Sequence, residues 1–219
     1  MRTLAILPIK NLSEAKQRLA TMLSSGPRRA LAEAMFSDVL TALRRSSTVE
    51  DILVVTRDHT AQQIAGGHGA LVLDDEEPGQ SPAALLGVRY ALDHEYERVL
   101  LVPGDCPLLA PRDVDALIAL PHEDPSALIV PDRHGTGTNA LLLTPPDSLP
   151  PAFGPDSCER HVADAEVAGT VSEVVSVDSL ELDIDTPEDL EVLRGLLQSS
   201  HGGAAHTRGM LSQMLRSRT

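Results

Sequence analysis

Three positively charged side chains lie close together near the start of the chain, at Lys10, Lys16 and Arg18. Lys10 and Lys16 are the only lysines in the sequence, which otherwise carries its positive charge on sixteen arginines. A lysine offers a compact charge and an arginine a planar set of donors, and together they suit a polyphosphate. The spacing leaves one alternative open, a solvated helix start whose cations pair with Glu14.

An aspartate, Asp105, follows an aliphatic segment in the motif VPGDCPLL. Gly104, directly before it, lets the backbone approach a ligand closely. A carboxylate at this position suits Mg²⁺, which proteins typically hold with one or two carboxylates together with substrate phosphates. A structural role also stays open, because an aspartate can cap a turn before Pro107.

A second acidic motif, LDIDTPEDL, combines a helix start with two further aspartates. Thr186, Pro187 and Asp189 fit an N-cap, a first helical residue and an approximate capping box. Asp183 and Asp185 have no such explanation. On a strand their side chains face the same way, and they repel each other unless a cation lies between them or one is protonated. We interpret this pair as metal ligands.

Two glycine-containing motifs suit an anionic substrate. DRHGTGTNALLL contains Thr138, and FGPDSCERH contains Gly154 and Ser157 at an expected helix start. Free backbone N–H groups at the start of a helix bind phosphate or carboxylate. Either motif alone could be an ordinary turn or cap, so the hypothesis depends on finding both in one chain.

Alternating strands and helices must position these residues. Aliphatic runs predict strands at 3–9, 51–56, 70–73, 98–103, 127–131 and 139–144, and later in VSEVVSV and LELDID. Spacing and caps predict helices at 27–45, 60–65, 81–96 and 111–120, and in DSCERHVADAEVAG and TPEDLEVLRGLL. The alternation predicts an α/β fold with a mainly parallel sheet covered on both faces, plus an antiparallel hairpin near Asn139. Such sheets bind ligands at the carboxyl ends of strands, where the strand order reverses.

The length of 219 residues suits one α/β domain, which we assign to residues 1–197. Residues 198–219 are rich in Gly, Ser, His and Arg and lack sustained periodicity. We therefore expect a flexible C-terminal tail there, with room for a short helix near its end. Cys106 and Cys158 are too few for a disulfide framework and lack metal-ligand spacing, so free thiols are expected.

The charge balance restricts the partners. A formal net charge of −14 at pH 7 opposes binding to nucleic acid or to an anionic membrane. No apolar run approaches the roughly 18 residues of a membrane span, and the N-terminal apolar segment is too short for a secretory signal. We expect a cytoplasmic protein without nucleic acid or membrane as partner. The sequence leaves both a monomer and a homodimer open.

Taken together, LPIKNLSEAKQRL, PGDCPLL, DRHGTGTNALLL, FGPDSCERH and LDIDTPEDL resemble one family across the chain to about residue 197. It is the family of CofC/FbiD-type guanylyltransferases, which act on 2-phospho-L-lactate or phosphoenolpyruvate in the biosynthesis of coenzyme F-420. The resemblance implies a single-domain, three-layer nucleotidyltransferase fold of the GT-A-like Rossmann type. It also implies an enzyme that transfers GMP from GTP onto a small phosphorylated carboxylic acid, with Mg²⁺ as cofactor and pyrophosphate as product.

The resemblance also implies roles for individual residues. They are Lys10, Lys16 and Arg18 for catalysis and the GTP phosphates, Asp105, Asp183 and Asp185 for metal, and Thr138, Gly154 and Ser157 for the acid. One departure concerns the base, because the family often has a GLN-type segment where this chain has GQS. We therefore assign recognition of the purine to Gln80 or Ser81. The motifs support specificity for guanine less firmly than they support binding of the phosphates.

The residues do not choose the acid, because phosphoenolpyruvate, 2-phospho-L-lactate and 3-phospho-D-glycerate share the same charged groups. The preference for arginine over lysine indicates a high-GC genome. On that ground a bacterial source, with phosphoenolpyruvate as substrate, is our first expectation and 2-phospho-L-lactate the second.

Two other classes of protein stay open on the residues alone. A molybdenum-cofactor or sugar-phosphate nucleotidyltransferase usually has a glycine-rich loop after the first strand, whereas LPIKNLSEAKQRL contains no glycine. A non-catalytic nucleotide-binding module could keep the basic motif. It would have no reason to keep Asp105, Asp183 and Asp185 together.

Overall fold

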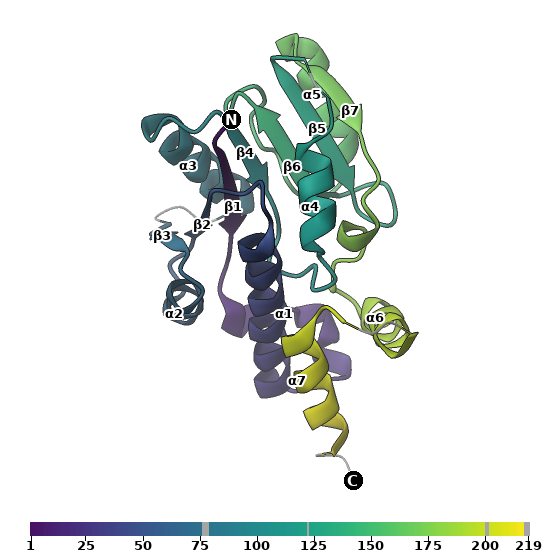
Figure 1. Ribbon diagram of the computed structural model, residues 1–219. Helices are drawn as coiled ribbons and strands as arrows, with labels where there is room; N and C mark the ends of the chain where they lie inside the picture. Colours follow the sequence, from purple (N-terminus) through teal and green to yellow (C-terminus); the bar gives the residue numbers. More distant parts are fainter. Residues whose placement is uncertain (76–78, 122, 200–201, 217–219) are drawn as a thin grey trace.

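The aliphatic runs of the sequence form a seven-stranded sheet in the computed structural model, which describes residues 1–75, 79–121, 123–199 and 202–216 (Figure 1). The strands are β1 (Thr3–Pro8), β2 (Asp51–Val55), β3 (Leu71–Leu73), β4 (Arg98–Leu101), β5 (Ser126–Pro131), β6 (Thr138–Thr144) and β7 (Val171–Val174). The helices are α1 (Ser25–Arg45), α2 (His59–Gly67), α3 (Gln80–Asp93), α4 (Pro111–Ile118), α5 (Ser157–Ala168), α6 (Pro187–Ser199) and α7 (Ala205–Arg216). Short 3-10 helices are η1 (Leu12–Glu14), η2 (Gln17–Thr21) and η3 (Asp178–Leu180).

The sheet is mixed and mainly parallel, as predicted. Its strand order is β3-β2-β1-β4-β6-β5-β7. β1 pairs in parallel with both β2 and β4, whereas β6 runs antiparallel to its neighbours β4 and β5. The chain leaves β1 toward β2 on one side and returns to β4 on the other. The carboxyl ends of β1 and β4 therefore mark the point where the strand order reverses.

Helices cover both faces of the sheet, which confirms the three-layer prediction. Leu7 of β1 packs with Phe36 in a buried cluster that includes α1, α2 and α4. Its neighbour Ile6 points to the opposite face, into a cluster with Val88 of α3 that also includes α5. Because both faces are buried, the strands are aliphatic at successive positions instead of alternating with polar residues. Among the described helices, none is long and apolar enough to cross a membrane.

Helix α3 approaches β1 closely at Gly87. A Cβ atom built at Gly87 would lie 2.5 Å from Cγ2 of Ile6, so a side chain there would force the helix or the strand to move. The same helix begins at Gln80, near the carboxyl end of β1. The packing at Gly87 thus fixes where the first turn of α3 lies relative to the sheet.

The predicted strand in LELDID is absent, and this prediction was wrong. Residues 181–186 are irregular, with their backbone hydrogen bonds directed to loops and side chains. The side-chain amide of Asn139 donates to the carbonyl of Leu180 at 2.7 Å, and the N–H of Ile184 donates to the carbonyl of Asp105 at 3.2 Å. The alternation that suggested a strand reflects the burial of Leu182 and Ile184 on either side of Asp183.

The C-terminal residues are also more ordered than expected. In place of a flexible tail, helix α7 packs against α1 (Figure 1). The carboxylate of Asp38 in α1 accepts hydrogen bonds from the backbone N–H groups of His206 and Thr207, and Leu211 is buried in a cluster with Leu31. The side chain that caps α7 lies far away in the sequence, so no local N-cap signal predicted this helix.

Candidate active site

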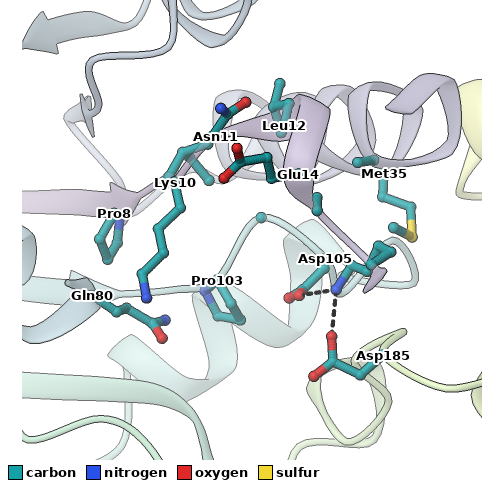
Figure 2. Close-up of a pocket in the computed structure, with 15 residues that line it drawn as sticks. Pro8, Lys10, Asn11, Leu12, Glu14, Met35, Gln80, Pro103, Asp105 and Asp185 are labelled. Carbon is teal, nitrogen blue, oxygen red and sulfur yellow. Dashed lines mark hydrogen bonds and ion pairs between the residues drawn. The ribbon is translucent and has the colours of Figure 1, made fainter. Parts of the chain in front are cut away.

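A cavity of about 410 Å³ opens at the carboxyl ends of β1 and β4. Its walls come from the loop after β1, the loop after β4, the start of α3 and the segment before α6, and they include Lys10, Lys16, Gln80, Asp105 and Asp185 (Figure 2). Cations and carboxylates from segments far apart in the sequence therefore meet in one hollow. This is the position at which ligands bind in open α/β sheets.

Lys16 is held between two carboxylates of this cavity. Its ammonium group donates to Oδ2 of Asp105 and, at 2.8 Å, to Oδ1 of Asp185 (Figure 2). Its side chain is only 6% exposed. Burial alone would lower the pKa of the Lys16 ammonium, but the two carboxylates outweigh burial and raise that pKa above its ordinary value. Lys16 therefore stays charged, and its positive charge is neutralised by the protein itself.

The backbone of Lys16 is unusual for a residue other than glycine. Its φ is 59° and its ψ is 39°, which is the left-handed region, and it lies directly before η2. Such a conformation costs on the order of 1 kcal/mol for a residue with a Cβ atom. The ion pairs of the side chain fix the residue in place, and the turn aims the ammonium group at Asp105 and Asp185.

The three predicted metal ligands have different surroundings. Oδ1 of Asp105 is buried and has no hydrogen-bond partner. Burial and the nearby charge of Asp105 raise the pKa of Asp183, although the Asn139 side-chain amide donates to Oδ1 of Asp183 at 3.3 Å. Burial would also raise the pKa of Asp185, but Lys16 reverses the effect and lowers it. We call Lys16, Asp105, Asp183 and Asp185 the charged cluster.

The charged cluster is not a finished metal site. Within the described residues, no group of three or more His, Cys, Asp or Glu side chains is arranged to hold a metal ion. The ammonium of Lys16 takes the place between Asp105 and Asp185 that a cation would occupy. The unpartnered Oδ1 of Asp105 and the raised pKa of Asp183 both indicate that this set of oxygens lacks positive charge.

The remaining predicted nucleotide-binding residues differ in position. Lys10 is exposed and lines the cavity together with Gln80. Arg18 lies outside the lining and is exposed, though its charge contributes to lowering the pKa of Asp185. Ser81 also lies outside the lining, where its hydroxyl oxygen accepts from the backbone N–H of Phe153 at 3.0 Å.

The predicted acid-binding residues form a second group, at β6 and the start of α5. The hydroxyl of Ser157 donates to Oγ1 of Thr138 at 3.1 Å, and the N–H of Ser157 donates to the carbonyl of Gly154 at 3.2 Å. Gly154 has a φ of 126°, a conformation that favours glycine. Thr138 and Asn139 are consecutive residues of β6, and the side-chain amide of Asn139 contacts Asp183, so neighbouring positions of this strand belong to the one group and contact the other.

The sequence analysis missed one member of this group, His161. Nδ1 of His161 lies 3.0 Å from Oγ1 of Thr138, and the His161 side chain is fully buried. Burial, together with the positive charge of Arg160, lowers the pKa of His161 to about 4. His161 lies one helical turn after Ser157, a spacing that places both side chains on the same face of α5 and that could have identified it. We call Thr138, Ser157 and His161 the hydroxyl cluster.

A mainly parallel α/β sheet whose switch point holds this cavity has the architecture of a nucleotidyltransferase. The solved structure of 4-diphosphocytidyl-2C-methyl-D-erythritol synthase matches with a TM-score of 0.64 and 17% identity, over 90% of this chain and 98% of that one. Glucosyl-3-phosphoglycerate synthase from Mycobacterium tuberculosis, in complex with Mg²⁺ and uridine-diphosphate, matches with a TM-score of 0.58 and 14% identity, over 98% and 78%. At these identities the likeness establishes the fold alone.

Sequence relatives define the family. A family model described as "Guanylyl transferase CofC like" matches residues 3–216. A phosphoenolpyruvate guanylyltransferase from Conexibacter woesei is 55% identical over 218 residues, which is 99% of this chain and 98% of that protein. A 3-phospho-D-glycerate guanylyltransferase from Colwellia psychrerythraea is 37% identical over 193 residues, covering 88% and 91%. The chain belongs to the CofC-like guanylyl transferase family, which confirms the resemblance of its motifs and makes it a nucleotidyltransferase.

Proposed function

We propose that this enzyme transfers GMP from GTP onto the phosphate of phosphoenolpyruvate, with release of pyrophosphate, as a step of coenzyme F-420 biosynthesis. The observation that carries the proposal is that consecutive residues of β6 serve the two clusters, since Thr138 belongs to the hydroxyl cluster and Asn139 contacts Asp183 of the charged cluster. In this proposal the charged cluster offers Lys16 and metal-binding carboxylates for a triphosphate, and the hydroxyl cluster offers neutral donors for a small acid. Relatives at 55% and 40% identity are named phosphoenolpyruvate guanylyltransferase, which supports this acid over the others.

3-Phospho-D-glycerate is the second candidate acid. The relative that is 37% identical is named for it, and the acid has the same phosphate and carboxylate groups. 2-Phospho-L-lactate, our second expectation from the sequence, shares these groups as well. A pocket of neutral donors distinguishes these acids only by the shape of their carbon skeletons.

The reaction needs little from a general base. A phosphate oxygen of the acid is already anionic near neutral pH, so it attacks the α-phosphorus of GTP directly. The new P–O bond forms in line with the bond between the α-phosphorus and the oxygen that bridges it to the β-phosphorus. That bond breaks, and pyrophosphate leaves with the bridging oxygen. Catalysis then consists of bringing two anions together and neutralising the charge that develops. Lys10, Lys16 and Arg18 supply positive side chains for this purpose.

Asp105 and Asp183 would hold Mg²⁺, with Asp185 beside them. Oxygen ligands suit this ion, and the unpartnered Oδ1 of Asp105 fits such a partner. Bound Mg²⁺ supplies charge neutralisation on the phosphates of GTP. A cation held there would also neutralise Asp105, one of the two carboxylates that Lys16 contacts, and Lys16 would then be available to the phosphates.

Recognition of the base falls to the start of α3. Gln80 lines the cavity, and its side-chain amide can both donate to and accept from a purine edge. Ser81 accepts from the N–H of Phe153, so it supports the wall and keeps its own hydroxyl proton for another partner. We assign contact with guanine to Gln80 and leave Ser81 as the weaker candidate.

Pyrophosphate release tests this function directly. GTP is paired with phosphoenolpyruvate, 2-phospho-L-lactate and 3-phospho-D-glycerate in turn, and the series is repeated with CTP and ATP. We expect the highest kcat/KM for GTP with phosphoenolpyruvate, and no turnover without Mg²⁺. Absence of release with GTP and all three acids, or faster release with CTP, would overturn the proposal.

A further inference from the structure

We propose that His161 is a positioning residue that fixes the hydroxyl of Thr138 so that its proton points at the phospho-acid. This inference rests on the proposed function, because it assumes that the acid binds beside Thr138. Nothing in the motifs assigned a role to His161.

The tautomer of His161 follows from its contact with the backbone. The N–H of Ala152 donates to Nε2 of His161 at 2.9 Å, and a backbone N–H can only donate. Nε2 is therefore unprotonated, and the single proton of the neutral ring is on Nδ1. Nδ1 lies 3.0 Å from Oγ1 of Thr138, so the ring donates this proton to the threonine oxygen.

The surroundings keep the ring neutral. His161 is fully buried, and burial lowers its pKa to about 4. Arg160 acts in the same direction and Asp164 opposes it. The guanidinium of Arg160 donates to the carbonyls of Ala152 and Pro155 and holds the segment whose N–H contacts His161. His161 therefore supplies a directed N–H group and no charge.

Oγ1 of Thr138 accepts two hydrogen bonds, which uses both of its lone pairs. One comes from Nδ1 of His161 at 3.0 Å and the other from the hydroxyl of Ser157 at 3.1 Å. The O–H bond of Thr138 therefore points away from both His161 and Ser157. In the described part of the chain no acceptor is recorded for this proton, and Thr138 retains 9% exposure.

This arrangement gives the acid pocket a donor with a fixed orientation. An anionic carboxylate or phosphate is the acceptor that such a donor prefers, and a hydrogen bond to a charged group is stronger than one between neutral groups. Without the N–H of His161, the Thr138 hydroxyl can rotate and donate to Ser157 instead. Affinity for the acid then falls, although the hydroxyl itself is still present.

Two substitutions of His161 separate positioning from packing. In His161→Asn the side-chain amide nitrogen can take the place of Nδ1 and donate to Thr138, but the contact with Ala152 is lost. In His161→Gln the amide oxygen can take the place of Nε2 and accept from Ala152, but nothing donates to Thr138. Kinetics of pyrophosphate release and thermal unfolding are measured for both.

We expect His161→Gln to raise the KM for phosphoenolpyruvate about tenfold, with the KM for GTP unchanged. His161→Asn, which keeps a donor to Thr138, should leave the KM for phosphoenolpyruvate close to that of the unaltered enzyme. Thr138→Val should raise the same KM, and adding His161→Gln to it should cause no further loss, because the two residues act through one proton. Equal defects in both His161 variants, parallel to their loss of thermal stability, would overturn the proposal. So would additive effects in the double variant.

A measurement on the unaltered protein keeps this test independent of folding and of turnover. Nitrogen-15 NMR of the histidine ring at pH 7 should show His161 neutral, with its proton on Nδ1. A proton on Nε2, or a charged ring, would overturn the positioning role even if the enzyme is active. Failure of the unaltered enzyme to use any of the three acids would refute the proposed function, with the observed tautomer unaffected.

Discussion

The charged cluster and the hydroxyl cluster are held together in opposite ways. The charged cluster combines one ammonium with three carboxylates, and its main contacts are ion pairs. The hydroxyl cluster has no charged member, and its contacts are directed hydrogen bonds between buried groups. The first can be satisfied by exchanging one cation for another, whereas the second depends on fixed geometry.

This difference suits the two clusters to different substrates in our proposal, the charged cluster to the triphosphate and the hydroxyl cluster to the acid. A triphosphate brings several negative charges, and it must replace the contacts that Lys16 makes with Asp105 and Asp185. A small acid has few atoms with which to make contacts, so it benefits most from donors that already point toward it. We therefore expect changes in the charged cluster to lower kcat, and changes in the hydroxyl cluster to raise the KM of the acid alone.

The largest effect is expected for Asp105→Asn. It removes the charge that faces Lys16 and, in our proposal, Mg²⁺, so kcat should fall about 1000-fold. Steady-state pyrophosphate release at saturating substrates measures the loss. Asp147→Asn, at an exposed position outside the cavity lining, is the matched control. If both variants behave alike, the charged cluster is not the catalytic side of the site.

Lys16→Ala comes next, with an expected loss in kcat of about 100-fold and an unchanged KM for the acid. The variant also leaves Asp105 and Asp185 without their shared cation, so its thermal unfolding temperature should fall and recover on addition of Mg²⁺. Calorimetry with and without the metal checks this stability effect. Unaltered steady-state kinetics would remove the basis for assigning the triphosphate to this cluster.

Ser157→Ala examines the other side of the comparison. The change removes one donor to Thr138 and should raise the KM for phosphoenolpyruvate about tenfold, with kcat and the KM for GTP nearly constant. Ser148→Ala is a control of equal size, because the Ser148 hydroxyl donates to the carbonyl of Ser126, outside the hydroxyl cluster. A fall in kcat without a change in KM would show that the two clusters do not divide their tasks.

The smallest effect is expected for Arg18→Ala. Arg18 is exposed and outside the cavity lining, so its loss should lower kcat/KM for GTP only about threefold, and less at high salt. Arg45→Ala, at the end of α1, serves as the control for an exposed arginine. A loss as large as that of Lys16→Ala would place Arg18 within the charged cluster after all.

The sheet and its helices were predictable because their signals are local. Aliphatic runs such as RVLLVP identified β4, and Pro111 at a helix start identified α4. The two errors concern contacts between distant segments. LELDID is held by Asn139 and Asp105 instead of by a strand, and α7 is capped by Asp38. Neither partner is visible from the segment itself.

The site was predicted in part for the same reason. Motifs located Lys16, Asp105 and Asp185, since each follows a strand or precedes a helix with a clear cap. They did not show that Lys16 bridges the two carboxylates, which depends on how three loops meet at the edge of the sheet. His161 was missed although its spacing from Ser157 places both side chains on one face of α5, because the role of a helical histidine depends on hydrogen-bond partners that the sequence does not show.

The close approach of Gly87 to Ile6 has a consequence for the shape of the cavity. The first turn of α3 forms one wall of the cavity, and the space of a single methyl group at residue 87 decides how far that wall stands from β1. Gly87→Ala would move the first turn of α3, and Gln80 with it, relative to β1. A smaller residue at position 6 would set how far the turn moves. A change at this packed position in the protein interior can therefore widen or narrow the cavity, while every ionic group keeps its identity.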